Sequence, residues 1–298
     1  MRRPDEGSSL TISAVSSMLG IPVPTIRSWE RRYGFPSPGR TAGRHRRYAL
    51  HEIELLRMLR DQITRGHPAR EAVALVRRAP AGGSPRAKHL EDFLASTMGL
   101  DPTRLRAALD AAAETLGVEA AVQDVALPAM REIGTRWRTG TCEVANEHLA
   151  TEVVRSWLAR LTAVAPPPFH PRPIVLACGP KDLHSIGLEA FGLLLARRGW
   201  GRRLLGALTP SDSVISAVRA SEAIAAVVTS QRNVTRRSAV ETITAVAAVP
   251  RITAFFAGDA FSAPSSRRGV PGIYLGDDLV EAVEVVDRTL VSPQRRGA

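Results

Sequence analysis

The chain has 298 residues and a mass of 32.1 kDa, which is enough for two or three domains with buried cores. Hydrophobic residues make up 44% of it, and no apolar run reaches the roughly 18 residues of a membrane span. The N-terminus lacks the apolar stretch of a signal peptide, and two cysteines are too few for a disulfide framework. These features exclude a membrane-spanning protein and a disulfide-rich secreted one, and they predict a cytoplasmic protein with no membrane partner.

Positive charge is concentrated near the N-terminus. The formal net charge is +11, and residues 1–80 contain 15 arginines against 7 acidic residues. A segment this basic is typical of a protein that binds a polyanion, because each neutralised phosphate releases counterions. A segment rich in glycine, proline and serine lies near residue 80, and a proline-rich segment lies near residue 168. They divide the chain into three predicted domains, at 1–80, 86–165 and 173–293.

The basic segment has the pattern of a winged helix-turn-helix. Helices are expected over 12–19 and 25–33, with a basic, turn-rich loop at 40–48 and amphipathic helices at 51–59 and 68–78. The second helix carries Arg27, Arg31 and Arg32, as a helix that enters a major groove would. The loop is suited to gripping phosphates as a wing.

The runs Ile26–Gly34 and Arg40–Tyr48 resemble the winged helix-turn-helix of the MerR family, and the resemblance covers roughly residues 9–78. It implies that the partner is double-stranded operator DNA. It also implies a homo-oligomer, a dimer or a tetramer, because heads of this type bind paired half-sites. The residues implicated in DNA binding are Thr25, Arg27, Arg31, Arg32, Arg40, Thr41, His45, Arg46 and Tyr48. For Tyr48, packing in the core or the wing is the competing interpretation.

Residues 86–165 predict a four-helix bundle, with helices near 86–96, 102–116, 119–138 and 143–164. Trp137 closes the third helix, and Glu147 and His148 follow early in the fourth. An aromatic plate beside an acid–imidazole pair can cover a flat polar ligand. A plain interaction or dimerisation bundle fits the same pattern.

Residues 173–293 alternate strands and helices, with strands expected at 174–178, 203–208, 224–230, 252–258 and 272–275. Repeated strand–helix units of this length predict a parallel, doubly wound sheet of the flavodoxin-like (Rossmann) type. The predicted fold class is therefore multidomain, α and α/β. Ligands of such sheets bind beyond the carboxyl ends of the strands, which places the loop after Cys178 at a binding edge.

That loop contains Asp182, His184 and Gly187, spaced as in the cobalamin-binding motif of corrinoid-binding domains. In such a motif an imidazole nitrogen coordinates cobalt, and the carboxylate accepts the other ring proton. Glycine lets the start of the helix lie close to the corrin or its nucleotide tail. A surface histidine beside an aspartate that caps the helix is the competing interpretation.

The order of basic head, helical bundle and corrinoid-type sheet resembles the CarH/LitR-like photoreceptor branch of the MerR family. This resemblance implies that cobalamin, most simply adenosylcobalamin, is the cofactor, with its cobalt on His184. The full set of cofactor-binding residues that it marks is His184, Asp182, Gly187, Trp137, Glu147, His148, Ser230 and Gly258.

Three positions depart from this branch. The segment after Ser230 reads Gln231-Arg232 and lacks the usual leucine, and alanine replaces the first glycine of the pair that ends at Gly258. Arg138 stands where the light-sensing members have a histidine that captures cobalt.

These features together predict a DNA-binding transcriptional regulator, a repressor controlled by cobalamin, and not an enzyme. The resemblance implies adenosylcobalamin and light as its signals, while Arg138 removes the histidine through which the light-sensing members capture cobalt. One alternative is a MerR-like regulator that has lost the cofactor and responds to a protein antagonist or another small ligand. A corrinoid-dependent methyl-transfer protein is the more distant alternative. No catalytic residue is predicted, and the cobalt of cobalamin is the only metal expected.

Overall fold

The computed structural model describes residues 9–40, 46–64, 67–78 and 85–291. The chain divides into two compact units, Met1–Glu91 and Asp92–Ala298. Helix α5, Pro85–Met98, crosses the boundary between them. The finer division into three domains, at 1–80, 86–165 and 173–293, stays a prediction. In the part of the chain that is described, no helix is long and apolar enough to cross a membrane.

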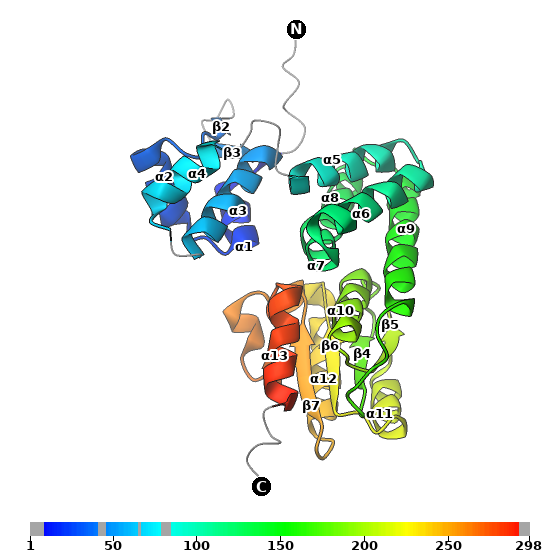
Figure 1. The fold of residues 1–298 in the computed structure, drawn as a ribbon. Coiled ribbons are helices and arrows are strands. Elements are labelled where there is room, and N and C mark those ends of the chain that lie inside the picture. Colours follow the sequence, from blue (N-terminus) through cyan, green and yellow to red (C-terminus); the bar gives the residue numbers. More distant parts are fainter. Residues whose placement is uncertain (1–8, 41–45, 65–66, 79–84, 292–298) are drawn as a thin grey trace. The chain divides into compact units, whose positions relative to one another are not determined.

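The N-terminal unit contains short helices around a small antiparallel sheet in the order β1-β3-β2 (Figure 1). Its elements are β1 (Ser9–Leu10), α1 (Ile12–Leu19), α2 (Val23–Tyr33), β2 (Gly39–Arg40), β3 (Arg46–Ala49), α3 (Leu50–Thr64) and α4 (Ala69–Arg78). The hydroxyl of Thr11 accepts the amide of Ala14 at 3.3 Å and caps α1, as predicted. Helix α2 begins two residues earlier than expected, because Pro24 occupies its first turn, where no amide hydrogen is needed.

The second unit begins with the bundle, whose helices are α5, α6 (Pro102–Leu116), α7 (Val118–Ala121), α8 (Leu127–Arg138) and α9 (Val144–Ala163). The third predicted helix is interrupted by a π-helical turn, η1 (Val122–Ala126), between α7 and α8. Pro128 follows this turn in the first positions of α8. Since its ring has no amide hydrogen and clashes with the carbonyl four residues earlier, the proline explains why the hydrogen-bond pattern widens there.

The same unit continues into a five-stranded sheet in the order β5-β4-β6-β7-β8, and every neighbouring pair is parallel. This order confirms the flavodoxin-like prediction. The strands are β4 (Ile174–Cys178), β5 (Arg202–Gly206), β6 (Ala225–Thr229), β7 (Thr253–Ala257) and β8 (Ile273–Tyr274). The helices are α10 (Ile186–Arg197), α11 (Ser211–Ala220), α12 (Asn233–Ala247) and α13 (Leu279–Val291), with 3-10 turns η2 (Asp259–Phe261) and η3 (Pro264–Arg267).

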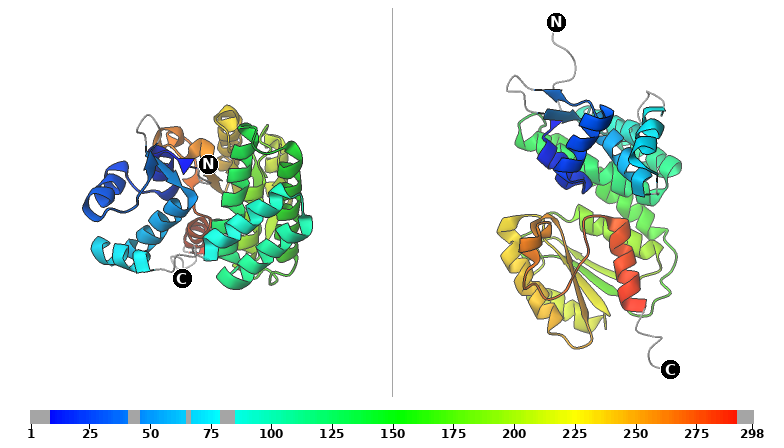
Figure 2. Two further views of the ribbon diagram at one scale, coloured as in Figure 1. Left: turned by 90° about the horizontal axis from the view of Figure 1, so that it is seen from above. Right: turned by 90° about the vertical axis from the view of Figure 1, so that its left-hand side faces the viewer.

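Helices cover both faces of the sheet, as the two side views show (Figures 1 and 2). Helices α11 and α12 pack on one face, where they form an apolar core with β4, β6 and β7, while α10 and α13 pack together on the other. Every residue of the central strands β4 and β6 is buried, which explains their uninterrupted apolar sequences. The long helix α9 of the bundle packs against α10. The carboxyl ends of β4, β6 and β7 therefore meet at one edge of the sheet, where the predicted cofactor residues lie.

Candidate functional site

Helix α2 presents the basic side chains expected of a recognition helix. Arg27, Arg31 and Arg32 are all exposed, while Ile26 and Trp29 of the same helix are buried in the core of the unit. Thr25 lies half-buried in the first turn. This separation of a charged face from an apolar one leaves the three arginines available to a nucleic acid.

Glu30 joins this helix to the strand that ends the wing. Its carboxylate accepts the hydroxyl of Tyr48 and, at 2.7 Å, the Nε of Arg46. Burial and the bond to Glu30 raise the pKa of Tyr48 above its usual range, and the bond to Glu30 also raises the pKa of Arg46. The prediction that Tyr48 contacts DNA is wrong for this structure, because its side chain is completely buried. The hydroxyl of Tyr48 instead joins β3 to Glu30 of α2.

The other wing residues are only partly described. Arg46 keeps about a third of its side chain exposed beside Glu30. Arg40 ends β2, and Thr41 and His45 lie outside the described residues. Their predicted roles in DNA binding stay predictions.

Asp182 and His184 form a pair at the carboxyl end of β4. The Nδ1 atom of His184 lies 2.8 Å from Oδ1 of Asp182, and the same oxygen accepts the backbone amide of His184 at 3.0 Å. Asp182 is 1% exposed, whereas the side chain of His184 is 54% exposed. With Nδ1 held on the carboxylate, the imidazole leaves Nε2 as the nitrogen free to bind a ligand or a metal.

Asp182 also ties this loop to its neighbours. Its Oδ2 accepts the backbone amide of Gln231 at 2.6 Å, and its carbonyl accepts the amide of Leu208 at 2.8 Å. One buried carboxylate therefore connects the loops after β4 and β6. Behind it, burial raises the pKa of the Cys178 thiol to about 11, so this thiol is a core side chain rather than a nucleophile.

Ser230 and Gly258 lie next to each other where β6 and β7 end. The hydroxyl of Ser230 is buried and bonds to that of Thr235 at 2.8 Å. Gly258 has a φ of 108°, and a Cβ atom there would lie 2.2 Å from the carbonyl oxygen of Ser230. Only glycine fits this close approach of two backbones. Both residues therefore shape the binding edge, and the second glycine of the family pair is the one that this chain retains.

Gln231 crosses the edge between these loops. Its Oε1 accepts the amide of Asp259 at 3.2 Å, and its Nε2 would lie 3.9 Å from a Cβ atom built on Gly187. The side chain thus runs from the start of α10 to the loop after β7. Gly187 is the position where a larger side chain would approach it.

The predicted cap residues lie at the turn between α8 and α9, which pack against each other. Trp137 is in the last turn of α8 and is 50% exposed. Glu147 and His148 lie in the first turns of α9, where Nδ1 of His148 is 2.7 Å from Oε2 of Glu147. The side chain of His148 is 73% exposed. All three are accessible at one end of the bundle, as a ligand-covering role requires. Arg138 bonds to the hydroxyl of Thr135 at 3.2 Å.

A polar cluster that the sequence did not predict lies beside His184. Arg155 of α9 donates to Oε1 of Glu189 at 3.2 Å and to the hydroxyl of Ser185 at 3.3 Å. Ser185 in turn donates to Glu189 at 2.7 Å. Ser185 and Glu189 are four residues apart at the start of a helix, and this spacing could have predicted their contact. Nothing in the sequence pointed to Arg155 as their partner.

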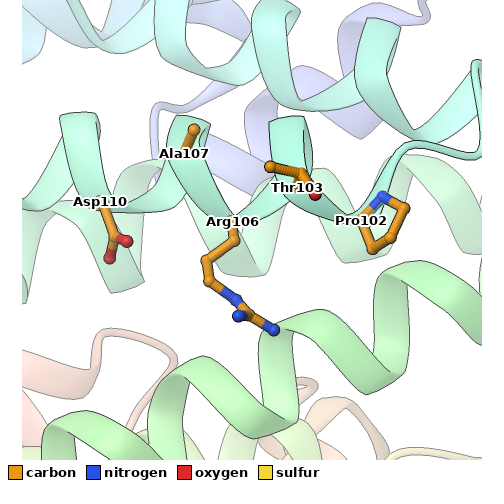
Figure 3. Close-up of a pocket in the computed structure, with 5 residues that line it drawn as sticks. All are labelled: Pro102, Thr103, Arg106, Ala107 and Asp110. Atoms are coloured by element: carbon orange, nitrogen blue, oxygen red, sulfur yellow. The ribbon is translucent and has the colours of Figure 1, made fainter.

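A shallow pocket of about 300 Å³ lies elsewhere, along one face of α6 (Figure 3). It is lined by Pro102, Thr103, Arg106, Ala107 and Asp110. The carboxylate of Asp110 accepts hydrogen bonds from Nε1 of Trp157 at 2.9 Å and from Nη2 of Arg160 at 2.5 Å, both on α9. None of the predicted site residues lines this pocket. Within the described ranges, no three His, Cys, Asp or Glu side chains gather in a way that could hold a metal ion by themselves.

Comparison with known proteins gives two family matches. Residues 10–79 match the MerR HTH family of regulatory proteins, and residues 89–162 match the B12 binding domain family. The HTH-type transcriptional repressor CarA of Myxococcus xanthus is 38% identical over 210 residues, which cover 69% of this chain and 71% of CarA. The chain belongs to this family of MerR-type regulators.

A second member of the MerR-type family, the HTH-type transcriptional repressor CarH of Myxococcus xanthus, is 33% identical over 223 residues, covering 70% of this chain and 74% of CarH. The monomethylamine corrinoid protein of Methanosarcina barkeri has the same fold over 68% of this chain and 98% of its own, with a TM-score of 0.54 and 11% identity. The curated relatives are repressors, in agreement with the prediction of a regulator and not an enzyme.

Proposed function

We propose that this chain represses transcription by binding operator DNA through the helix-turn-helix, and that a cobalamin held by His184 controls this binding. The observation that carries the proposal is the pairing of an exposed imidazole with a buried carboxylate at the carboxyl edge of the sheet. The pairing is the arrangement that orients a histidine for a metal: Nδ1 is engaged and Nε2 is accessible. The match of residues 89–162 to the B12 binding domain supports the identity of the ligand.

The residues present fit a corrinoid. His184 would hold the cobalt, Asp182 would keep the imidazole in the required tautomer, and Gly187 leaves room where α10 begins. A bound corrinoid supplies a cobalt centre with an exchangeable ligand on its upper face, and thus a chemical state that a regulator can read. The half-exposed Trp137, with Glu147 and His148, supports the finer proposal that this upper ligand is adenosyl.

The DNA-binding part of the proposal rests on the arginines of α2. Arg27, Arg31 and Arg32 are exposed on the helix that a helix-turn-helix inserts into the major groove. Paired half-sites require at least two copies of the chain, so we propose that the protein acts on DNA as a homo-oligomer, a dimer or a tetramer.

The experiment is to mix the full chain with adenosylcobalamin in the dark, separate it by gel filtration, and measure the absorption of the protein peak. We expect coloured protein from the wild type and colourless protein from His184→Ala, with both variants eluting as folded species. Operator binding measured by fluorescence anisotropy should then depend on cobalamin in the wild type only. A wild-type peak without corrinoid absorption would contradict the proposal.

A regulator without a cofactor is the second candidate, and one observation favours it. The side chain of Gln231 bridges the loops at the binding edge, with Oε1 on the amide of Asp259. If that bridge persists, another small ligand or a protein antagonist would supply the signal. The same gel-filtration experiment separates the two candidates, since only the first gives coloured protein.

Arg138 limits the proposed response to light. A guanidinium does not coordinate cobalt, because it stays protonated and has no acceptor nitrogen. Any effect of illumination on operator binding is therefore expected to proceed without capture of cobalt at position 138. Arg138→His is expected to introduce an absorption change on illumination that the wild type lacks.

A further inference from the structure

The loop that carries His184 is attached to the bundle by a continuous polar contact. Ser185 follows His184 directly and is only 3% exposed. Its hydroxyl donates its one hydrogen to Oε1 of Glu189 and accepts Nη2 of Arg155. Although Ser185 occupies the N-cap position of α10, its side chain makes no capping bond there. The serine therefore links Glu189 of its own helix to Arg155 of the bundle, instead of capping the helix amides.

Arg155 is held from three sides. Its Nε donates to Glu189 at 3.2 Å, its Nη1 to Glu152 at 3.2 Å, and its Nη2 to Ser185 at 3.3 Å. The side chain of Glu189 is only 13% exposed, which strengthens its interaction with the guanidinium relative to a surface pair. A planar guanidinium can satisfy these separate acceptors at once, which a lysine ammonium on a flexible stem does less well.

Arg155 and His148 share one face of α9. They are seven residues apart, which is almost two helical turns, or about 10 Å along the axis. The same helix therefore carries an exposed imidazole at one point and, two turns later, the arginine that touches the residue after His184. A shift or rotation of α9 at His148 moves Arg155 with it, because the helix between them is regular.

We propose that Arg155 is a positioning residue that couples helix α9 to the His184 loop, so that contacts on the cap side set the position of the cobalt-binding imidazole. This proposal builds on the proposed function for the identity of the ligand, but the coupling itself belongs to the protein without cofactor. A second contact joins the bundle to α10 at its other end, where Arg197 donates to Glu119 at 2.9 Å. That contact lies at the end of α10 away from His184, and it provides the matched control.

The test is hydrogen exchange on the full chain without cofactor, followed by mass spectrometry of the peptides that cover residues 182–189. Arg155→Gln and Ser185→Ala should each speed exchange of these amides about five- to tenfold, as expected for the loss of one or two hydrogen bonds that hold a local structure. Arg197→Gln removes the other bundle contact, and Arg160→Gln removes a contact of α9 with Asp110 inside the bundle. Both should leave exchange at 182–189 unchanged.

The second measurement is the absorption spectrum of the protein loaded with hydroxocobalamin. Arg155→Gln should reduce the corrinoid absorption of the protein, which His184→Ala abolishes, whereas Arg197→Gln should keep the wild-type absorption. Unchanged exchange in Arg155→Gln, or an equal increase in Arg197→Gln, would overturn the coupling and leave only a general tether between bundle and sheet. If the wild type binds no cobalamin, the proposed function is contradicted. The exchange measurement still tests the coupling of α9 to the His184 loop, because it uses the protein without cofactor.

Discussion

Replacement of Asp182 by asparagine tests how one buried carboxylate serves both the fold and the candidate ligand site. Its two oxygens accept three N–H groups: the amide and Nδ1 of His184 at 3.0 and 2.8 Å, and the amide of Gln231 at 2.6 Å. Asparagine has the same shape but only one oxygen. Whichever way the amide turns, its NH2 group points at an N–H donor, and at least one backbone amide loses its acceptor.

The structure sets the size of the effect. Because Asp182 is 1% exposed, water cannot replace the lost acceptor, and a buried unsatisfied donor costs about 1–3 kcal/mol. For a unit of this size each kcal/mol lowers the unfolding midpoint by about 2–4 °C. The imidazole of His184 also loses its charged hydrogen-bond partner, so cobalamin affinity should fall roughly 10–100-fold. Asp182→Asn is thus expected to lower stability and affinity together.

The assay is thermal unfolding of the full chain followed by tryptophan fluorescence, combined with a cobalamin titration. Trp157 and Trp200 are buried in the unit that contains Asp182, so the fluorescence change reports its unfolding. Asp92→Asn, at an exposed position of the same unit, is the matched control and should change neither quantity. An unfolding midpoint for Asp182→Asn equal to that of the control would refute the reasoning, because the buried amides would then have found other partners.

Three further outcomes are expected. Tyr48→Phe removes the hydroxyl bonded to Glu30, and it should lower the free energy of unfolding of the N-terminal unit in urea by about 1 kcal/mol. It should also weaken operator binding, although Tyr48 itself is buried. Unchanged operator affinity would contradict the role assigned to this bond. Arg27→Ala should reduce specific operator binding by about 1–3 kcal/mol in an anisotropy titration if this side chain contacts a base edge, while binding to unrelated DNA changes less. Gly258→Ala should lower the unfolding midpoint, because its Cβ atom would meet the Ser230 carbonyl at 2.2 Å; a midpoint equal to that of the wild type would show that the two loops can separate freely.

Local interactions made much of the fold readable from the sequence. The Thr11 cap and the glycines after α1 and α2 act within four residues of the helix ends that they define. The apolar runs of β4 and β6 indicated buried parallel strands, and the alternation of strands with helices limited the topology to the one observed. The Asp182–His184 pair was predictable for the same reason, since its members are two positions apart in the chain.

Contacts between residues far apart in the chain could not be predicted from these local patterns and depend on tertiary packing. Tyr48 is aromatic and follows a basic loop, but only the position of α2 beneath it shows that its hydroxyl bonds to Glu30 and not to DNA. Arg155 looks like one more exposed arginine of an amphipathic helix. Its role depends on α9 packing against α10, which brings it to Ser185, 30 residues away in the chain. The free energy of such contacts arises only when distant segments are already packed. Short-range periodicity and spacing therefore determine the helices, the strands and the Asp182–His184 motif. The tertiary fold determines which side chains of these elements contact one another.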